Sequence, residues 1–121
     1  MRPPLSFRMA YYILYGRFTM EIKLKDNERI EDLQCKGLKI IQNKKWFCFG
    51  MDAVLLTNYC DIKNNSKIVD LGTGTGIIPI LLSGKRNYSK AYGIEIQPEV
   101  AEMAERSVKL NALQEKIEIL N

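Results

Sequence analysis

The sequence contains no histidine, and its three cysteines, Cys35, Cys48 and Cys60, have no C-x-x-C spacing. Histidine acid–base chemistry and a Ser-His triad are therefore excluded, and we expect no metal site and buried, unpaired thiols. No apolar run approaches the roughly 18 residues of a membrane span, so we expect no membrane partner. The segment before Met20 contains Arg17 and lacks a small-residue cleavage pattern, which argues against a signal peptide.

A glycine-rich turn follows a short apolar segment in the second half of the chain. Lys67–Leu71 has the apolar, β-branched composition of a buried parallel strand. Gly72, Gly74 and Gly76 then let the backbone turn sharply and approach a ligand without Cβ atoms in the way. We expect a helix over Ile77–Ser83, with its free N–H groups directed at whatever lies above the turn. This arrangement predicts a cradle for a nucleotide-type cofactor.

The spacing of the glycines narrows the choice of cofactor. The dinucleotide fingerprint G-x-G-x-x-G requires a glycine where this chain has Ile77, so NAD is disfavoured. A phosphate-binding P-loop requires a lysine directly after the glycines, and the next lysine is Lys85, so ATP is disfavoured too. The remaining pattern, Asp70–Gly76, resembles the first motif of class I S-adenosylmethionine (SAM) dependent methyltransferases. That resemblance implies that the acid reaches the methionine part of the cofactor.

A second acid follows the next predicted strand. Tyr92–Ile96 is short and apolar, and within it Glu95 lies 19 residues beyond Gly76. A carboxylate at this position can accept hydrogen bonds from both ribose hydroxyls. The alternative is a solvated carboxylate at a strand end, and we favour the ligand role for both Glu95 and Asp70.

The C-terminal part continues the same alternation. Pro98 begins a predicted amphipathic helix, and Lys116–Leu120 alternates as a third strand. Right-handed β-α-β crossovers give a parallel sheet with helices on its faces. The predicted fold is α/β and Rossmann-like, with three parallel strands and flanking helices, preceded by an N-terminal strand and helix segment. One edge of the strand Lys67–Leu71 would be bare, so self-association through this sheet edge is possible.

Positive charge is concentrated in the first part of the chain. Residues 1–69 hold 12 Lys and Arg against 7 Asp and Glu, whereas residues 70–121 hold 6 against 7, which gives +5 and −1 and sums to the overall +4. Within the basic part, Lys36, Lys39, Lys44 and Lys45 precede the aromatic run Trp46–Phe49. Such a mixture is typical of nucleic-acid binding, and equally of a solvated hairpin whose aromatic side chains enter the core.

The chain resembles the N-terminal half of the bacterial tRNA(Val) adenine-37 N6-methyltransferase family in three blocks that have the family's order and spacing. These blocks are residues 28–43, 47–56 and 70–82. The resemblance implies a cytoplasmic, SAM-dependent enzyme that methylates the exocyclic amine of an adenine in tRNA. It also implies that Ile96 contacts the cofactor's adenine and that Asp52 belongs to a block that closes over the cofactor, where Asp52 also fits as a cap of a helix Ala53–Cys60. The predicted cofactor-binding residues are Asp52, Asp70, Gly72, Thr73, Gly74, Gly76, Glu95 and Ile96.

One departure from this family affects catalysis. Amine-methylating relatives carry an Asn/Asp-Pro-Pro-Tyr/Phe motif after the fourth strand, and the only Pro-Pro of this chain is Pro3-Pro4. No catalytic residue is therefore predicted, and we expect this chain alone, a truncated fragment, to be inactive. The alternatives are an rRNA guanine-N2 or protein-glutamine N5 methyltransferase, or a non-catalytic SAM-binding fragment. The expected division is a leader of doubtful status at 1–19, a substrate or cofactor lid at 20–66, and the first half of the SAM-binding domain at 67–121.

Overall fold

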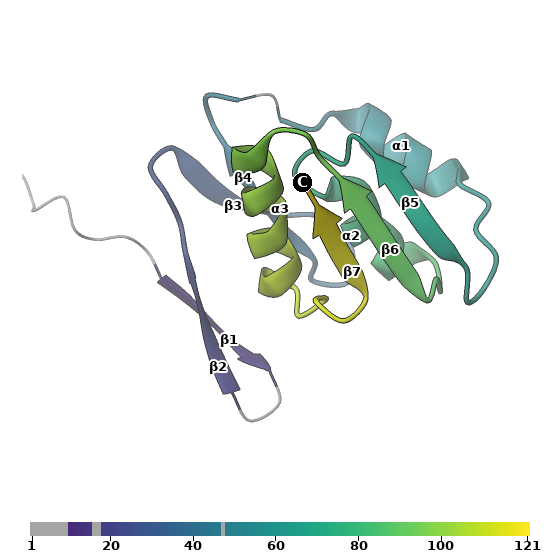
Figure 1. Ribbon diagram of the computed structural model, residues 1–121, viewed down its shortest axis with the longest axis horizontal. Helices are drawn as coiled ribbons and strands as arrows, with labels where there is room; N and C mark the ends of the chain where they lie inside the picture. Colours follow the sequence, from purple (N-terminus) through teal and green to yellow (C-terminus); the bar gives the residue numbers. More distant parts are fainter. Residues whose placement is uncertain (1–9, 16–17, 47) are drawn as a thin grey trace, which may run out of the picture.

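The computed structural model describes residues 10–15, 18–46 and 48–121, with side chains from Glu21 onward. Two antiparallel hairpins come first, followed by three helices that alternate with three strands (Figure 1). The hairpins are β1 (Ala10–Tyr15) with β2 (Phe18–Lys23), and β3 (Glu28–Asp32) with β4 (Lys39–Asn43). The remaining elements are α1 (Met51–Tyr59), β5 (Lys67–Leu71), α2 (Ile77–Lys85), β6 (Lys90–Ile94), α3 (Pro98–Leu110) and β7 (Ile117–Leu120).

The last three strands form a parallel sheet in the order β5-β6-β7. Val69 lies opposite Tyr92, and Leu71 lies opposite Ile94, so β5 and β6 end at the same level. Residues that follow the two strands therefore meet at one edge of the sheet. This is the partial Rossmann-like fold that the sequence predicts, and the parallel βαβαβ order is confirmed.

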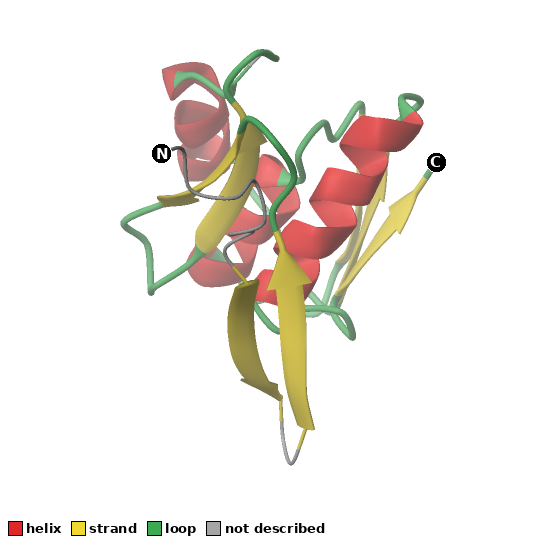
Figure 2. Cartoon of the chain, turned by 90° about the vertical axis from the view of Figure 1, so that its left-hand side faces the viewer, coloured by secondary structure: helices red, strands yellow, loops and turns green. Residues whose placement is uncertain are grey.

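The helices lie between the parallel sheet and the β3–β4 hairpin (Figure 2). On the sheet side, Ile80, Ala104, Val108 and Ile117 form part of the buried core. On the hairpin side, Ile40 packs with α2 residues, and the backbone N–H of Ile41 donates to the buried hydroxyl of Ser107 on α3 at 2.9 Å. The β3–β4 hairpin is thus fixed on the helix layer, opposite the sheet.

Arg106 joins α3 to the N-terminal part of the chain. Its guanidinium donates twice to the carboxylate of Glu28, at 2.6 Å each, and to Glu102 at 2.7 and 3.0 Å. A fifth bond, of 3.1 Å, goes to the carbonyl oxygen of Lys23 at the end of β2. All five N–H donors of the arginine are therefore used. These partners lower the pKa values of Glu28 and Glu102 despite the opposing effect of burial.

The second face of the sheet is open in the part of the chain that the structure describes. Val69 is 60% exposed and Leu71 is 77% exposed, and Ile94 and Leu120 lie beside Leu71 on the same face. The prediction of a fully buried strand at Lys67–Leu71, with helices on both faces, was therefore wrong. The helices α2 and α3 cover only one face, so alternate side chains of β5 remain in contact with solvent.

Several predicted boundaries also change. The helix after the glycines continues to Lys85 rather than ending at Ser83, and β6 covers Lys90–Ile94 rather than Tyr92–Ile96. Asp52 does not cap a helix Ala53–Cys60, because α1 begins at Met51 with Gly50 at its N-cap and Asp52 lies within the first turn. Strands β1 and β2 pair with each other on the two sides of residue 19, and the division expected there stays a prediction. No helix within the described ranges has the length and apolar character needed to span a membrane.

Candidate cofactor-binding site

The turn after β5 forms the floor of the site. Gly72, Gly74 and Gly76 have φ values of +72°, +59° and +83°, in the left-handed region that favours glycine. The N–H groups of Gly72 and Thr73 both donate to the carbonyl oxygen of Ile94, at 2.9 Å each, which ties the turn to the end of β6. A Cβ atom at Gly72 or Gly74 would meet nothing within 4 Å. The turn therefore presents bare backbone to open space.

Gly76 has a different structural role. It is the N-cap of α2, and a Cβ atom there would lie 3.5 Å from the Cβ of Ala104 on α3 and 3.6 Å from Ile80. The third glycine thus allows the turn to pack closely against α3. Gly76 does not line the cavity described below.

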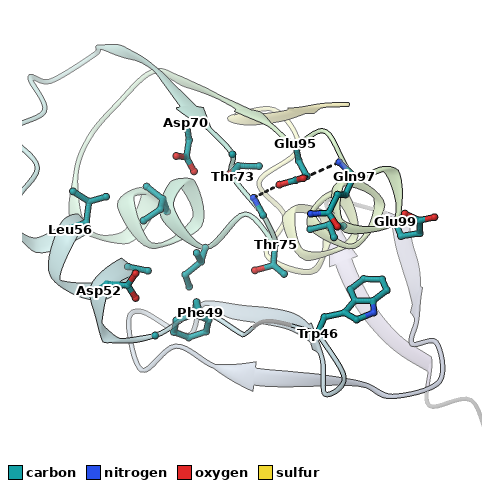
Figure 3. A pocket seen from close by; sticks show the side chains of 17 residues that line it. Trp46, Phe49, Asp52, Leu56, Asp70, Thr73, Thr75, Glu95, Gln97 and Glu99 are labelled. Carbon is teal, nitrogen blue, oxygen red and sulfur yellow. Dashed lines mark hydrogen bonds between the residues drawn. The ribbon is translucent and has the colours of Figure 1, made fainter.

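Glu95 connects the glycine turn to the start of α3. Its side chain is buried, with the residue 6% exposed, and one carboxylate oxygen accepts the N–H of Gly74 at 3.0 Å. The other oxygen accepts the N–H of Gln97 at 2.9 Å (Figure 3). A carboxylate offers about four acceptor positions, so two remain for a ligand. The sequence indicated a ligand role for this acid but not its contacts with the turn.

Asp70 lies at the end of β5 with one oxygen unsatisfied. Its Oδ2 atom is buried and has no hydrogen-bond partner among the described residues. Burial raises the pKa of the Asp70 carboxyl above its ordinary value of 3.8, and the nearby side chain of Thr73 opposes this increase. An unpaired buried acceptor is costly unless a donor reaches it, and a cationic ligand would supply one.

These groups line a single cavity of about 730 Å³, which is within the size range of small-molecule sites. Four acids contribute to its wall: Asp52, Asp70, Glu95 and Glu99. No Lys or Arg is present among the described residues that line it. A pyrophosphate would meet carboxylates without a basic partner, which gives a structural reason to disfavour NAD and ATP.

The structure brings most of the predicted residues together. Asp52, Asp70, Gly72, Thr73, Gly74 and Glu95 all line the cavity. Ile96 follows β6 but is 88% exposed and is not part of the lining. In the ranges that the structure describes, no group of three or more His, Cys, Asp or Glu side chains could hold a metal ion.

Sequence reasoning missed the position of Trp46 in the cavity, whereas the resemblance already implied that the block containing Phe49 closes over the cofactor. Trp46 and Phe49, from the loop between β4 and α1, both line it. Phe49 also packs against the core group of Ile40 and Ile77, whereas Trp46 is 42% exposed. The basic and aromatic run was interpreted as a nucleic-acid surface or a hairpin core. Only the fold shows that Trp46 and Phe49 line the same cavity as the glycine turn.

Comparison with known proteins agrees with this geometry. The family model described as "Histone methylation protein DOT1" matches residues 49–117, which is 69 of the 121 residues. A tRNA1(Val) (adenine(37)-N6)-methyltransferase of the Flavobacteriaceae bacterium strain 3519-10 is 31% identical over 72 residues, covering 60% of this chain and 31% of the relative. An inferred protein N5-glutamine methyltransferase of Methanocaldococcus jannaschii is 30% identical over 80 residues, covering 65% of this chain and 40% of the relative.

The fold has solved counterparts as well. Methanocaldococcus jannaschii Trm5, whose crystal structure was determined in complex with adenosine, superposes with a TM-score of 0.62 at 22% identity. The match covers 81% of this chain and 30% of that chain. Our chain spans roughly a third of the length of the relatives that it matches.

The chain belongs to the methyltransferase family that the matched model describes, because the match covers more than half of the sequence. The resemblance to bacterial tRNA1(Val) (adenine(37)-N6)-methyltransferases is confirmed. The family description contains the word histone, which concerns the proteins after which the family is named. It does not identify a substrate of this chain.

Proposed function

Given that family, we propose that this chain binds SAM in the cavity at the carboxyl ends of β5 and β6. The observation that carries the proposal is the pairing of a bare glycine turn with two acids, Asp70 and Glu95, at the ends of adjacent parallel strands. Ligands of open α/β sheets bind in this crevice. The residues present fit the cofactor, because the unpaired Asp70 oxygen suits a cationic donor and the described lining of the cavity contains no Lys or Arg.

Each predicted residue then has a separate task. Asp70, Gly72, Thr73 and Gly74 would hold the methionine part, while the free acceptor positions of Glu95 would take the ribose hydroxyls. Residues 20–66 would act as the lid, since Trp46, Phe49 and Asp52 reach the cavity from that segment. Gly76 would act indirectly by holding the turn against α3. Ile96 would contact the adenine only at the rim, because its side chain is exposed.

We further propose that the complete activity is methylation of the exocyclic amine of adenine 37 in tRNA(Val), in the cytoplasm. SAM supplies a methyl group already activated on a sulfonium, so positioning contributes more to the rate than acid–base chemistry. The support is the similarity to tRNA1(Val) methyltransferases over 60% of the chain. The 121 residues lack the Asn-Pro-Pro-Tyr motif that would hold the amine, so this chain alone should bind the cofactor without transferring its methyl group.

A second candidate is methylation of a glutamine side chain in a protein. It is favoured by the 30% identity to the inferred protein N5-glutamine methyltransferase. Both reactions use the same cofactor cavity, so the cavity does not distinguish them.

Calorimetric titration of the chain with SAM tests the binding proposal. We expect a saturable, one-site isotherm that Asp70→Ala weakens and that Glu105→Ala, an exposed change on α3 outside the cavity, leaves unchanged. The absence of binding at millimolar SAM would refute the proposal. A second assay follows tritium from labelled SAM into tRNA and into protein. We expect neither with this chain, and label in either fraction would show that the missing motif is not required.

A further inference from the structure

We infer that Trp46 is the stacking surface for the nucleoside end of the cofactor, an inference that rests on the proposed function and adds a residue to its site. Trp46 lies at the end of the cavity formed by Gln97 and Glu99, beyond Glu95 (Figure 3). Asp70 lies at the opposite end. If Glu95 holds the ribose, the base and sugar lie on the Trp46 side and the methionine part on the Asp70 side.

The loop that carries Trp46 is anchored on both sides. Before it, the Asn43 side chain accepts the N–H of Lys45 at 2.9 Å, and the Asn43 carbonyl accepts the N–H of Trp46 at 3.1 Å. After it, the N–H of Phe49 donates to the buried side chain of Gln42 at 3.1 Å. These bonds fix the backbone on either side of the indole. An anchored backbone reduces the conformational entropy that is lost when a ligand stacks on the ring.

The two aromatic rings of the cavity are not equivalent. Phe49 packs against Ile40 and Ile77, so its ring is partly committed to the core. Trp46 is absent from the buried core groups of the described residues and exposes 42% of its surface. A purine stacks on an exposed aromatic face, and such contacts contribute about 1–3 kcal/mol per base. Among the described rings that line the cavity, Trp46 therefore has the larger surface available for a base.

Trp46 is the only tryptophan of the chain, so its emission reports on this position alone when tyrosine is not excited. The full chain is titrated separately with S-adenosylhomocysteine, adenosine and methionine, and each titration is repeated by calorimetry. We expect S-adenosylhomocysteine and adenosine to change the tryptophan emission along the calorimetric isotherm, and methionine to leave it unchanged. An emission change with methionine alone would place Trp46 at the wrong end and overturn the inference.

Two variants test whether the ring contributes to affinity. Trp46→Ala should weaken S-adenosylhomocysteine binding by about fivefold or more, which corresponds to the lower limit for loss of one stacked base. Trp46→Phe, the matched control, keeps an aromatic face and should stay within about threefold of the wild type. Circular dichroism confirms that both variants fold. Equal affinity of Trp46→Ala and wild type would overturn the inference.

The measurements separate the two proposals. Calorimetric heat without any change in emission leaves the SAM site in place and refutes the role of Trp46. No heat with any of the three ligands refutes the SAM site and the role of Trp46 together. An emission change only with an adenine-containing RNA oligonucleotide would assign the ring to a substrate base and overturn the inference as well.

Discussion

Replacing Glu95 with Gln should destabilise the free chain as well as weaken ligand binding. The carboxylate accepts one backbone N–H from the glycine turn, at Gly74, and one from Gln97 before α3. A Gln side chain keeps one acceptor oxygen, while its NH2 group faces the other N–H donor. Hydrogen bonds to a charged acceptor contribute about 1.5–3 kcal/mol each, so the loss of one should lower the free energy of unfolding by about that amount.

Glu99→Gln is the matched control for this experiment. Glu99 lines the same cavity and undergoes the same chemical change, but it is exposed. Surface substitutions of this kind usually change stability by less than about 0.5 kcal/mol. Urea unfolding followed by circular dichroism measures both variants, and calorimetry with adenosine measures the effect on binding.

The expected pattern has two parts. Glu95→Gln should reduce the urea midpoint with an unchanged slope. It should also weaken adenosine binding by about tenfold, because the single amide oxygen already accepts a backbone N–H and has only one lone pair left for the two ribose hydroxyls. If Glu95→Gln unfolds at the wild-type midpoint, the carboxylate does not hold the turn in the way described. If both variants lose equal stability, the effect arises from cavity charge rather than from these two hydrogen bonds.

Three further substitutions test other parts of the structure. Asp70→Asn removes a carboxylate that has one buried, unpaired oxygen and a raised pKa, so it should increase stability at neutral pH by about 0.5–2 kcal/mol while weakening SAM binding. A loss of stability would contradict this. Arg106→Met should cost about 3–5 kcal/mol in urea unfolding. Wild-type stability should decline as the pH falls below 4.5 and through the lowered pKa values of Glu28 and Glu102. Arg106→Met should abolish this decline. An unchanged decline in the variant would refute the pairing of Arg106 with these two carboxylates. Val69→Lys, on the open sheet face, should reduce the concentration-dependent self-association that we propose for the wild type, as measured by size-exclusion chromatography. A wild type that stays monomeric at every concentration would contradict that proposal.

The local parts of the fold could be predicted because each has a short-range cause. Lys67–Leu71 was placed with its observed boundaries, since an apolar β-branched run ending at glycines specifies its own limits. The helix after it was ended too early, at Ser83, whereas α2 continues to Lys85. Gly84 instead lies inside α2, where a Cβ atom would come within 2.9 Å of Leu38 and 3.0 Å of Cys35. This glycine allows close packing by the β3–β4 connection, which is a long-range cause that periodicity does not reveal.

The candidate site also has a part that the sequence predicts and a part that it does not. The glycine turn and the acids after β5 and β6 follow from strand ends and spacing, and the parallel register brings them together. The contribution of Trp46 depends on folding the β3–β4 hairpin over the far side of the helices, opposite the sheet. The two backbone hydrogen bonds of Glu95 depend on side-chain direction. The spacing of residues in the sequence reveals neither the long-range packing of a hairpin nor the direction of a side chain.

The charge of the cavity has a consequence for the proposed reaction. With Asp52, Asp70, Glu95 and Glu99 in the wall and no basic residue among the described lining, the potential inside favours a cation. SAM carries a sulfonium charge that its demethylated product lacks, so the same carboxyl groups attract the cofactor more strongly than the product. Partial burial strengthens this difference, since screening by water and salt is weaker there than at the surface. The acids that position the cofactor would therefore also promote release of the product after transfer, and neither effect requires a catalytic base in this part of the fold.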